Sequence, residues 1–140
     1  MSRRSLIIAL HWSAFLLVLA MIKGGSAAVW LRWTFVVIGF GWVAMALIKG
    51  EMGRPGPKLT GVFRAAYPWM HKGMYALVAI AVILNGLALL GLAPLDSAWK
   101  ALLVLFVASI FHAIFHLWRH TALNDGALRM MTPKIWHKYL

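Results

Sequence analysis

The chain contains no cysteine and only three acidic residues among its 140 amino acids. Without cysteine it can form neither a disulfide nor an iron–sulfur cluster, and it cannot hold a haem covalently as c-type cytochromes do. The shortage of carboxylates also leaves few oxygen ligands for a divalent metal ion. These absences exclude several common kinds of redox and metal-binding protein.

Apolar residues dominate the composition, since 63% of the chain is hydrophobic and eight residues are tryptophan. A soluble domain of this length could not bury so much apolar surface. A transmembrane helix needs about 20 mostly apolar residues, and four stretches come close to or meet this length, at residues 5–22, 27–48, 70–92 and 97–118. The sequence therefore predicts an all-α integral membrane protein, a four-helix bundle formed by a single domain over residues 1–140.

The net charge of +11 would suit a nucleic-acid-binding protein, but the positions of the basic residues favour a membrane explanation. Most of them stand before the first stretch, between the second and third, or after the fourth: Arg3, Arg4, Lys49, Arg54, Lys58, Arg64, Lys72, Arg119, Arg129, Lys134 and Lys138. Lys23, Arg32 and Lys100 stand at the opposite boundary. Because loops rich in Lys and Arg stay in the cytoplasm, we expect both termini and the middle loop to be cytoplasmic, and no nucleic-acid partner.

The connecting segments carry weaker signals. Glycine and proline alternate with basic residues between positions 50 and 60, which is typical of a loop without regular structure. Asp96 or Ser97 is expected to cap the fourth helix. Residues 121–140 mix apolar and basic side chains, which predicts an interfacial segment on the inner membrane surface, with a frayed basic tail as the alternative.

All six histidines lie toward the expected cytoplasmic side, and two of them, His11 and His112, lie inside apolar stretches at matching depth. At 1.5 Å per residue, His11 is about 8 Å from the start of the first helix and His112 about 10 Å from Arg119. Ionisable groups inside a bilayer are costly and usually functional, and bundles build cofactor sites from facing helices. The spacing predicts that His11 and His112 ligate one non-covalently held b-type haem.

The other histidines leave alternatives open. His112, His116 and His120 recur every four residues and share one helix face, so they could line a metal site or a proton path, or be satisfied interior polar groups. His71 begins the third stretch and could lie among the lipid headgroups. The same interfacial alternative applies to His120 and is favoured for His137.

Two further groups of residues are candidates around a haem. Its propionates need cations, and four lie on the same side: Arg4, Arg64, Lys72 and Arg119. These cations could equally serve only as topology signals. Glycines let a flat cofactor press on a helix backbone, and the candidates are Gly39, Gly41, Gly73 and Gly86. Small residues are equally expected where two helices touch.

Several of these residues also form a recognisable pattern: His11-Trp12, His71 with Tyr75, then His112 and His120. The pattern resembles the prokaryotic cytochrome b561 family over nearly the whole chain. Its most specific piece is the sequence Asp-Gly-Ala-Leu-Arg-Met-Met-Thr-Pro at positions 125–133, which is similar to a tail motif of that family.

The resemblance implies a four-helix, quinone-linked electron carrier of the bacterial inner membrane and respiratory chain, related to the cytochrome b subunits of nickel–iron hydrogenase and formate dehydrogenase. Typical members hold two haems. The ligands of the inner haem carry over onto His11 and His112, whereas the positions of the outer-haem ligands fall on Phe35 and Lys100. Neither phenylalanine nor a protonated lysine ligates haem, so we expect one haem b.

We therefore expect an electron-transfer protein, rather than a stand-alone oxidoreductase, that exchanges electrons with a quinone or a partner subunit at one face. His116, His120 and Arg119 are best placed to touch a quinone or a propionate. The chain could work alone, as a homodimer or inside a membrane complex. The alternative function is an accessory or structural subunit of a larger respiratory or photosynthetic complex, with a reduced redox role or none.

Overall fold

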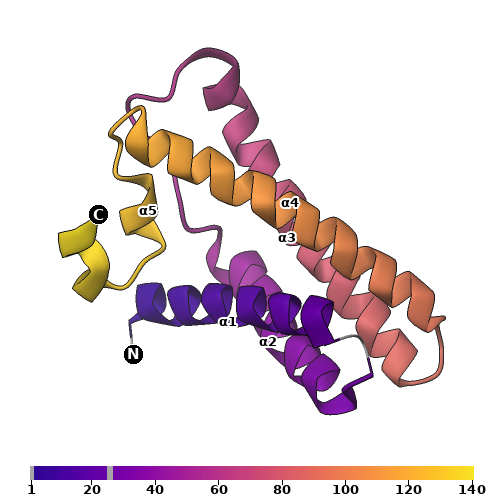
Figure 1. The fold of residues 1–140 in the computed structure, drawn as a ribbon. Coiled ribbons are helices and arrows are strands. Elements are labelled where there is room, and N and C mark those ends of the chain that lie inside the picture. Colours follow the sequence, from indigo (N-terminus) through magenta and orange to yellow (C-terminus); the bar gives the residue numbers. More distant parts are fainter. Residues whose placement is uncertain (1, 25–26) are drawn as a thin grey trace.

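A computed structural model describes residues 2–24 and 27–140, which are 80% helical and contain no strand. Four long helices follow the predicted stretches: α1 (Arg3–Gly24), α2 (Val29–Lys49), α3 (Gly61–Leu89) and α4 (Leu95–Thr121). All four are long and apolar enough to cross a membrane. The short helix α5 (Ala127–Met130) and the 3₁₀ helix η1 (Lys134–Tyr139) follow, and both chain ends lie at one end of the bundle (Figure 1). The prediction of an all-helical chain with four helices that could span a membrane is confirmed.

Helix α3 is longer than the sequence predicted, because it begins at Gly61 and not at residue 70. Its first turns contain Arg64 and Pro68, which reduce the local hydropathy. The search for apolar stretches therefore did not detect this part of the helix. The helix runs through Pro68, although proline removes one helix hydrogen bond and disfavours a helix interior. The irregular segment predicted between residues 50 and 60 is confirmed, since no helix is assigned there.

The predicted cap of α4 is wrong. The helix begins at Leu95, directly after Pro94, and no side chain caps it. Asp96 therefore lies in the first turn, where its negative charge interacts favourably with the positive end of the helix dipole. It pairs with Lys100 one turn later at 2.6 Å, and both side chains are well exposed.

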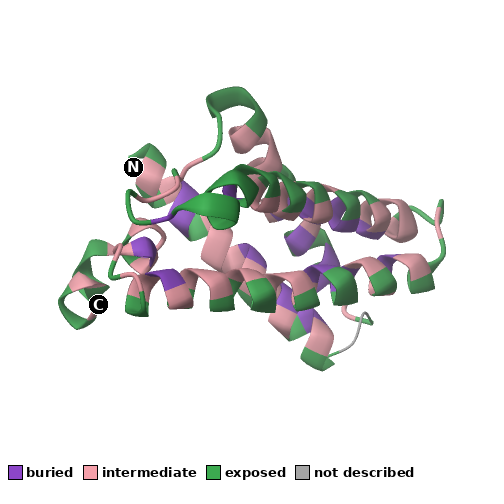
Figure 2. Ribbon diagram, turned by 90° about the horizontal axis from the view of Figure 1, so that it is seen from above, coloured by how far each residue is buried: buried purple, intermediate pink, exposed green. Residues whose placement is uncertain are grey.

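The helices pack in sequence order, and α1 also contacts α4, which closes the bundle. Buried residues lie on the inward faces of the helices and exposed residues on their outer faces (Figure 2). The largest buried cluster lies toward the end opposite the termini and is entirely apolar: Val18, Met21, Leu31, Phe35, Val78, Ala81, Val82, Leu102 and Leu105. The packed core therefore fills the half of the bundle in which the sequence lacks histidines.

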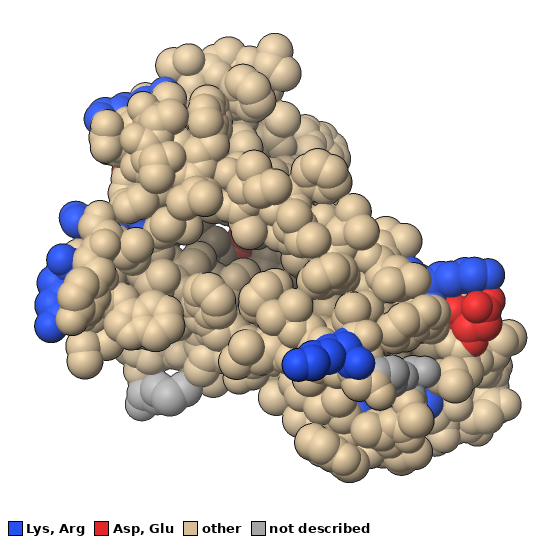
Figure 3. All heavy atoms as spheres, in the orientation of Figure 1, with Lys and Arg blue, Asp and Glu red and all other residues tan. Residues whose placement is uncertain are grey.

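The outer surface of the bundle is apolar between its ends. Leu16, Val37, Phe40, Ile83 and Phe111 are all more than half exposed, whereas lysine and arginine gather toward the two ends of the face shown in Figure 3. Soluble monomers rarely expose contiguous apolar surface on this scale. A bilayer would cover such a surface, which supports the assignment of the four long helices as membrane spans.

Gly39 sets the distance between α2 and α3. A Cβ atom at Gly39 would lie 2.5 Å from Cγ2 of Val82 and 3.8 Å from Cγ1 of Val78. Valine in a helix has essentially one χ1 rotamer, so Val82 cannot turn aside. We conclude that α3 needs the space left by the missing side chain of Gly39.

The substitution Gly39→Ala is therefore expected to destabilise the protein by about 1–3 kcal/mol through overpacking. The matched control is Gly41→Ala on the same helix, because a Cβ there meets nothing within 4 Å and alanine favours a helix by roughly 0.5–1 kcal/mol over glycine. Thermal unfolding in detergent micelles measures both, and Val82→Ala should rescue Gly39→Ala. Equal stability of the two glycine variants would contradict this account.

Candidate functional site

A cavity of about 390 Å³ lies in the half of the bundle that carries the termini. All four long helices contribute to its wall, together with the loop before α3 and the segment that contains α5. Most lining residues are apolar, and the polar exceptions include His11, His71, His112 and His116. The molecular surface is hollowed between α1 and α4 (Figure 3). Four histidines from three helices therefore face one apolar space.

His11 and His112, the predicted pair, enter this cavity from α1 and α4. The Nδ1 atom of each ring is buried and has no hydrogen-bond partner among the described residues. The ring of His11 is held edge-on by Trp42 and Trp12, with ring centroids 5.1 Å and 5.8 Å away. Buried polar atoms without partners are rare in folded proteins and call for an explanation.

His71, His112 and His116 lie closer to one another than the sequence indicated. The centroid of the His71 ring is 5.3 Å from those of both His112 and His116, which are 4.5 Å apart. Nδ1 of His71 lies 2.9 Å from the backbone oxygen of Tyr67. A carbonyl oxygen only accepts, so Nδ1 donates the proton and Nε2 of the neutral ring keeps its lone pair. The structure brings these three histidines together as a potential donor set.

The remaining predicted residues lie elsewhere. Nδ1 of His120 is buried without a partner among residues 2–24 and 27–140, but His120 does not line the cavity. His137 lies on η1 with Nε2 3.2 Å from the backbone oxygen of Thr132. Gly39 does not line the cavity, and its missing side chain leaves room for Val82 of α3.

Arg119 was predicted to bind a propionate, but it forms a buried ion pair with Asp125. Its Nε donates a hydrogen bond of 2.7 Å to Oδ2 of Asp125, and Nη2 lies 2.6 Å from the same oxygen. Both side chains have 0% exposure, and the guanidinium lies 4.9 Å from the centre of the Tyr67 ring. This pair joins α4 to the chain beyond it, and Nη1 of Arg119 is buried without a hydrogen-bond partner among the described residues.

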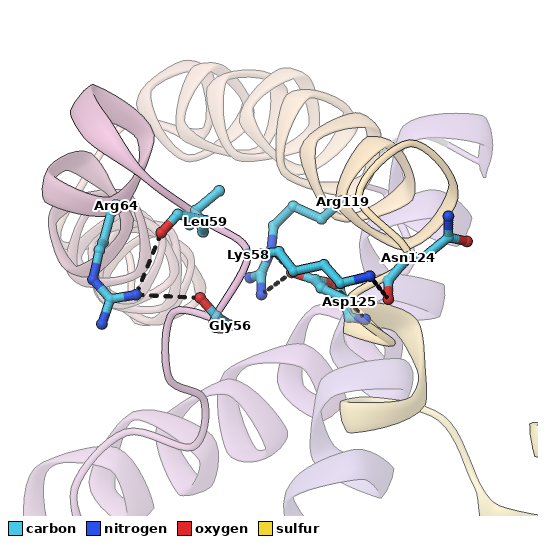
Figure 4. Close-up of polar contacts among 8 residues, drawn as sticks. Gly56, Lys58, Leu59, Arg64, Arg119, Asn124 and Asp125 are labelled. Atoms are coloured by element: carbon cyan, nitrogen blue, oxygen red, sulfur yellow. Dashed lines mark hydrogen bonds and ion pairs between the residues drawn. The ribbon is translucent and has the colours of Figure 1, made fainter.

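The loop before α3 packs against this ion pair (Figure 4). A Cβ at Gly56 would lie 2.8 Å from Oδ2 of Asp125 and 2.9 Å from Nη2 of Arg119. Lys58 donates to the backbone oxygen of Asn124 at 3.2 Å. The loop and the segment after α4 are therefore fixed to each other at the end of the cavity.

The other three predicted cations also have protein partners. Arg64 donates to the backbone oxygens of Gly56 and Leu59, as Figure 4 shows. Lys72 lies 5.1 Å from the ring centre of Trp69. Arg4 donates to the backbone oxygens of the C-terminal segment, and of the four it is the one that lines the cavity.

No known protein family, curated protein or solved structure matches the chain.

The C-terminal segment forms one wall of the cavity. It lies between the ends of α1 and α4 (Figure 1), and Nε1 of Trp12 donates to the backbone oxygen of Met131 at 2.8 Å. Ala127 and Thr132 are buried, whereas Ile135, Trp136 and Tyr139 of η1 are exposed. The η1 part has the exposed apolar side chains expected of an interfacial segment, whereas the apolar side chains of residues 127–132 are buried or partly buried.

Sequence reasoning missed one buried polar contact, between Arg32 of α2 and Asn85 of α3. Arg32 is 6% exposed and donates to Oδ1 and to the backbone oxygen of Asn85, both at 3.3 Å. Nδ2 of Asn85 in turn donates to the backbone oxygen of Ala81 at 2.9 Å. The position of Asn85 inside an apolar stretch was the available signal, because polar residues within a membrane span usually have partners there.

Proposed function

We propose that the protein is a membrane b-type cytochrome that holds one haem between His11 and His112 and exchanges electrons with a quinone or a partner subunit. One observation carries this proposal: the two histidines line the same apolar cavity from α1 and α4, each with a buried ring nitrogen that lacks a partner in the described chain. The cavity of about 390 Å³ falls within the range of about 300–1,000 Å³ typical of cofactor sites.

The residues of the cavity fit a haem chemically. Phe15, Val18 and Leu105 supply apolar walls, and the imidazoles of His11 and His112 would hold the haem iron. Arg4 at the rim can pair with a propionate. A bound haem would supply reversible one-electron transfer at its iron, while Trp12 and Trp42 hold the His11 ring in position.

Electron exchange at one face follows from the same arrangement. The other half of the bundle is filled by the apolar core around Phe35 and Leu102 and by the contact between Arg32 and Asn85. Lys100, at the second position where the family would place an outer-haem ligand, pairs with Asp96 at the surface. The basic residues at the end that carries the termini favour a cytoplasmic location for that end. We also propose that the protein is a relative of cytochrome b561 and lies in a bacterial inner membrane.

The test is haem content. The chain is purified in detergent, and pyridine haemochrome absorbance and a redox difference spectrum are recorded. We expect one low-spin b-type haem per chain. A chain that reproducibly lacks haem and co-purifies with other subunits in fixed stoichiometry would overturn the proposal in favour of the accessory-subunit alternative, and two haems per chain would refute the single site.

A further inference from the structure

We propose that the cavity has a second ligand: in the absence of haem, Zn²⁺ binds to His71, His112 and His116. This site goes beyond the proposed cytochrome function and does not depend on it, although the two sites share His112. His112 and His116 lie one turn apart on α4, and His71 faces them from α3. The three side chains are each half-buried.

The geometry is close to that of a metal site. One ring nitrogen from each histidine can be chosen so that all three lie within 4.8 Å of one another. Three such atoms lie within about 2.8 Å of a common centre, so each needs to move by at most about 0.7 Å to reach a Zn–N distance of about 2.1 Å.

The contact between His71 and Tyr67 prepares one ligand in advance. Nδ1 of His71 donates to the backbone oxygen of Tyr67 at 2.9 Å, so Nε2 of the neutral ring presents a lone pair. A hydrogen bond from the second ring nitrogen to a carbonyl is the usual support of a metal-bound histidine, because it fixes the tautomer and the ring orientation. This contact gives the cluster a feature that crowding of three rings alone does not require.

The charges around the cluster tolerate a cation. Arg119 lies over the Tyr67 ring beside it, but its ion pair with Asp125 compensates its charge. The donor set consists of nitrogen alone, which suits zinc, copper or nickel better than magnesium or calcium. Three protein ligands leave a fourth tetrahedral position open, as in zinc sites that bind water or an exchangeable ligand.

Binding of Zn²⁺ and haem should exclude each other, because His112 belongs to both donor sets. His11 belongs only to the haem pair, whereas His71 and His116 belong only to the zinc cluster. Substitution of His11 should therefore affect haem binding alone, and substitution of His71 or His116 should affect Zn²⁺ binding alone.

The experiment uses the full chain, freed of haem, in detergent. Zn²⁺ binding is measured by calorimetry, and Co²⁺ is added as a probe whose visible spectrum reports tetrahedral coordination. We expect one ion per chain. His116→Ala and His71→Ala should weaken binding on the order of 100-fold or more, at least as much as loss of an outer-shell partner does. His120→Ala is the matched control, since His120 lies on the same helix outside the cluster, and it should bind as the wild type does.

The outcomes separate this proposal from the haem proposal. Zn²⁺ binding that survives both His71→Ala and His116→Ala, or that is absent from the folded wild type, overturns the zinc site and leaves the haem proposal untouched. Haem binding that survives His11→Ala overturns the haem pair and leaves the zinc site standing. Circular dichroism and size-exclusion elution of each variant verify folding, and His71→Gln replaces any alanine variant that fails this check.

Discussion

The variant His112→Ala is expected to lose both haem and Zn²⁺, the largest functional effect of any single substitution in this chain. His112 is the one residue shared by the proposed haem pair and the zinc cluster, and its Nδ1 is buried without a partner in the described chain. Alanine offers no donor atom in place of the imidazole. The haem-to-protein absorbance ratio and Zn²⁺ calorimetry on purified, folded variant measure the two losses.

The control for this prediction is His11→Ala, which should lose haem alone. His11 enters the cavity from α1 and lies outside the zinc cluster. Because His116 also lines the cavity, it is the residue that could replace His112 as a haem ligand. If haem is retained in His112→Ala and lost only in the double variant His112→Ala/His116→Ala, the haem ligand on α4 is His116, one helical turn further along. Full retention in both variants would refute ligation from α4.

The four long helices were predictable because each is marked by a continuous apolar stretch, and the depth of His11 and His112 followed from helical rise alone. Depth does not specify which way a side chain points, so the approach of His71 to His112 and His116 could not be derived. That approach depends on how α3 is rotated about its axis where it packs against α4. No local sequence pattern specifies this rotation.

Residues with two plausible partners were harder to assign. Arg119 could have met a propionate or a carboxylate, and the choice depended on the turn after α4, where Asn124 and Gly126 adopt positive φ angles and bring Asp125 back toward the helix. Gly39 could have faced a cofactor or another helix, and the rotation of α2 against Val82 decided between them. The deciding contact is local for Arg119, six residues before Asp125, and is made between two helices for Gly39.

The ion pair between Arg119 and Asp125 should make the largest single contribution to stability among the charged residues. Both side chains are fully buried, so replacing Arg119 by leucine leaves a buried carboxylate whose remaining described partner is the backbone nitrogen of Ala127 at 2.9 Å. Breaking a buried pair by removing one member costs about 3–5 kcal/mol, because the other charge is left unpaired. We expect Arg119→Leu to lower the free energy of unfolding in micelles by this amount.

The double variant Arg119→Leu/Asp125→Leu distinguishes the pair from simple loss of packing. Removing both charges avoids the unpaired carboxylate, so the double variant should be more stable than Arg119→Leu alone, as found where buried ion pairs are replaced by apolar residues. Asp96→Asn is the exposed control, since its partner Lys100 is also well exposed and such pairs contribute little. The ion pair also lies against Gly56 and the loop before α3, so Arg119→Leu should increase proteolysis of residues 50–60. A variant with unchanged stability and an unchanged cleavage pattern would show that Asp125 finds another partner, and the structural role of Arg119 would then be wrong.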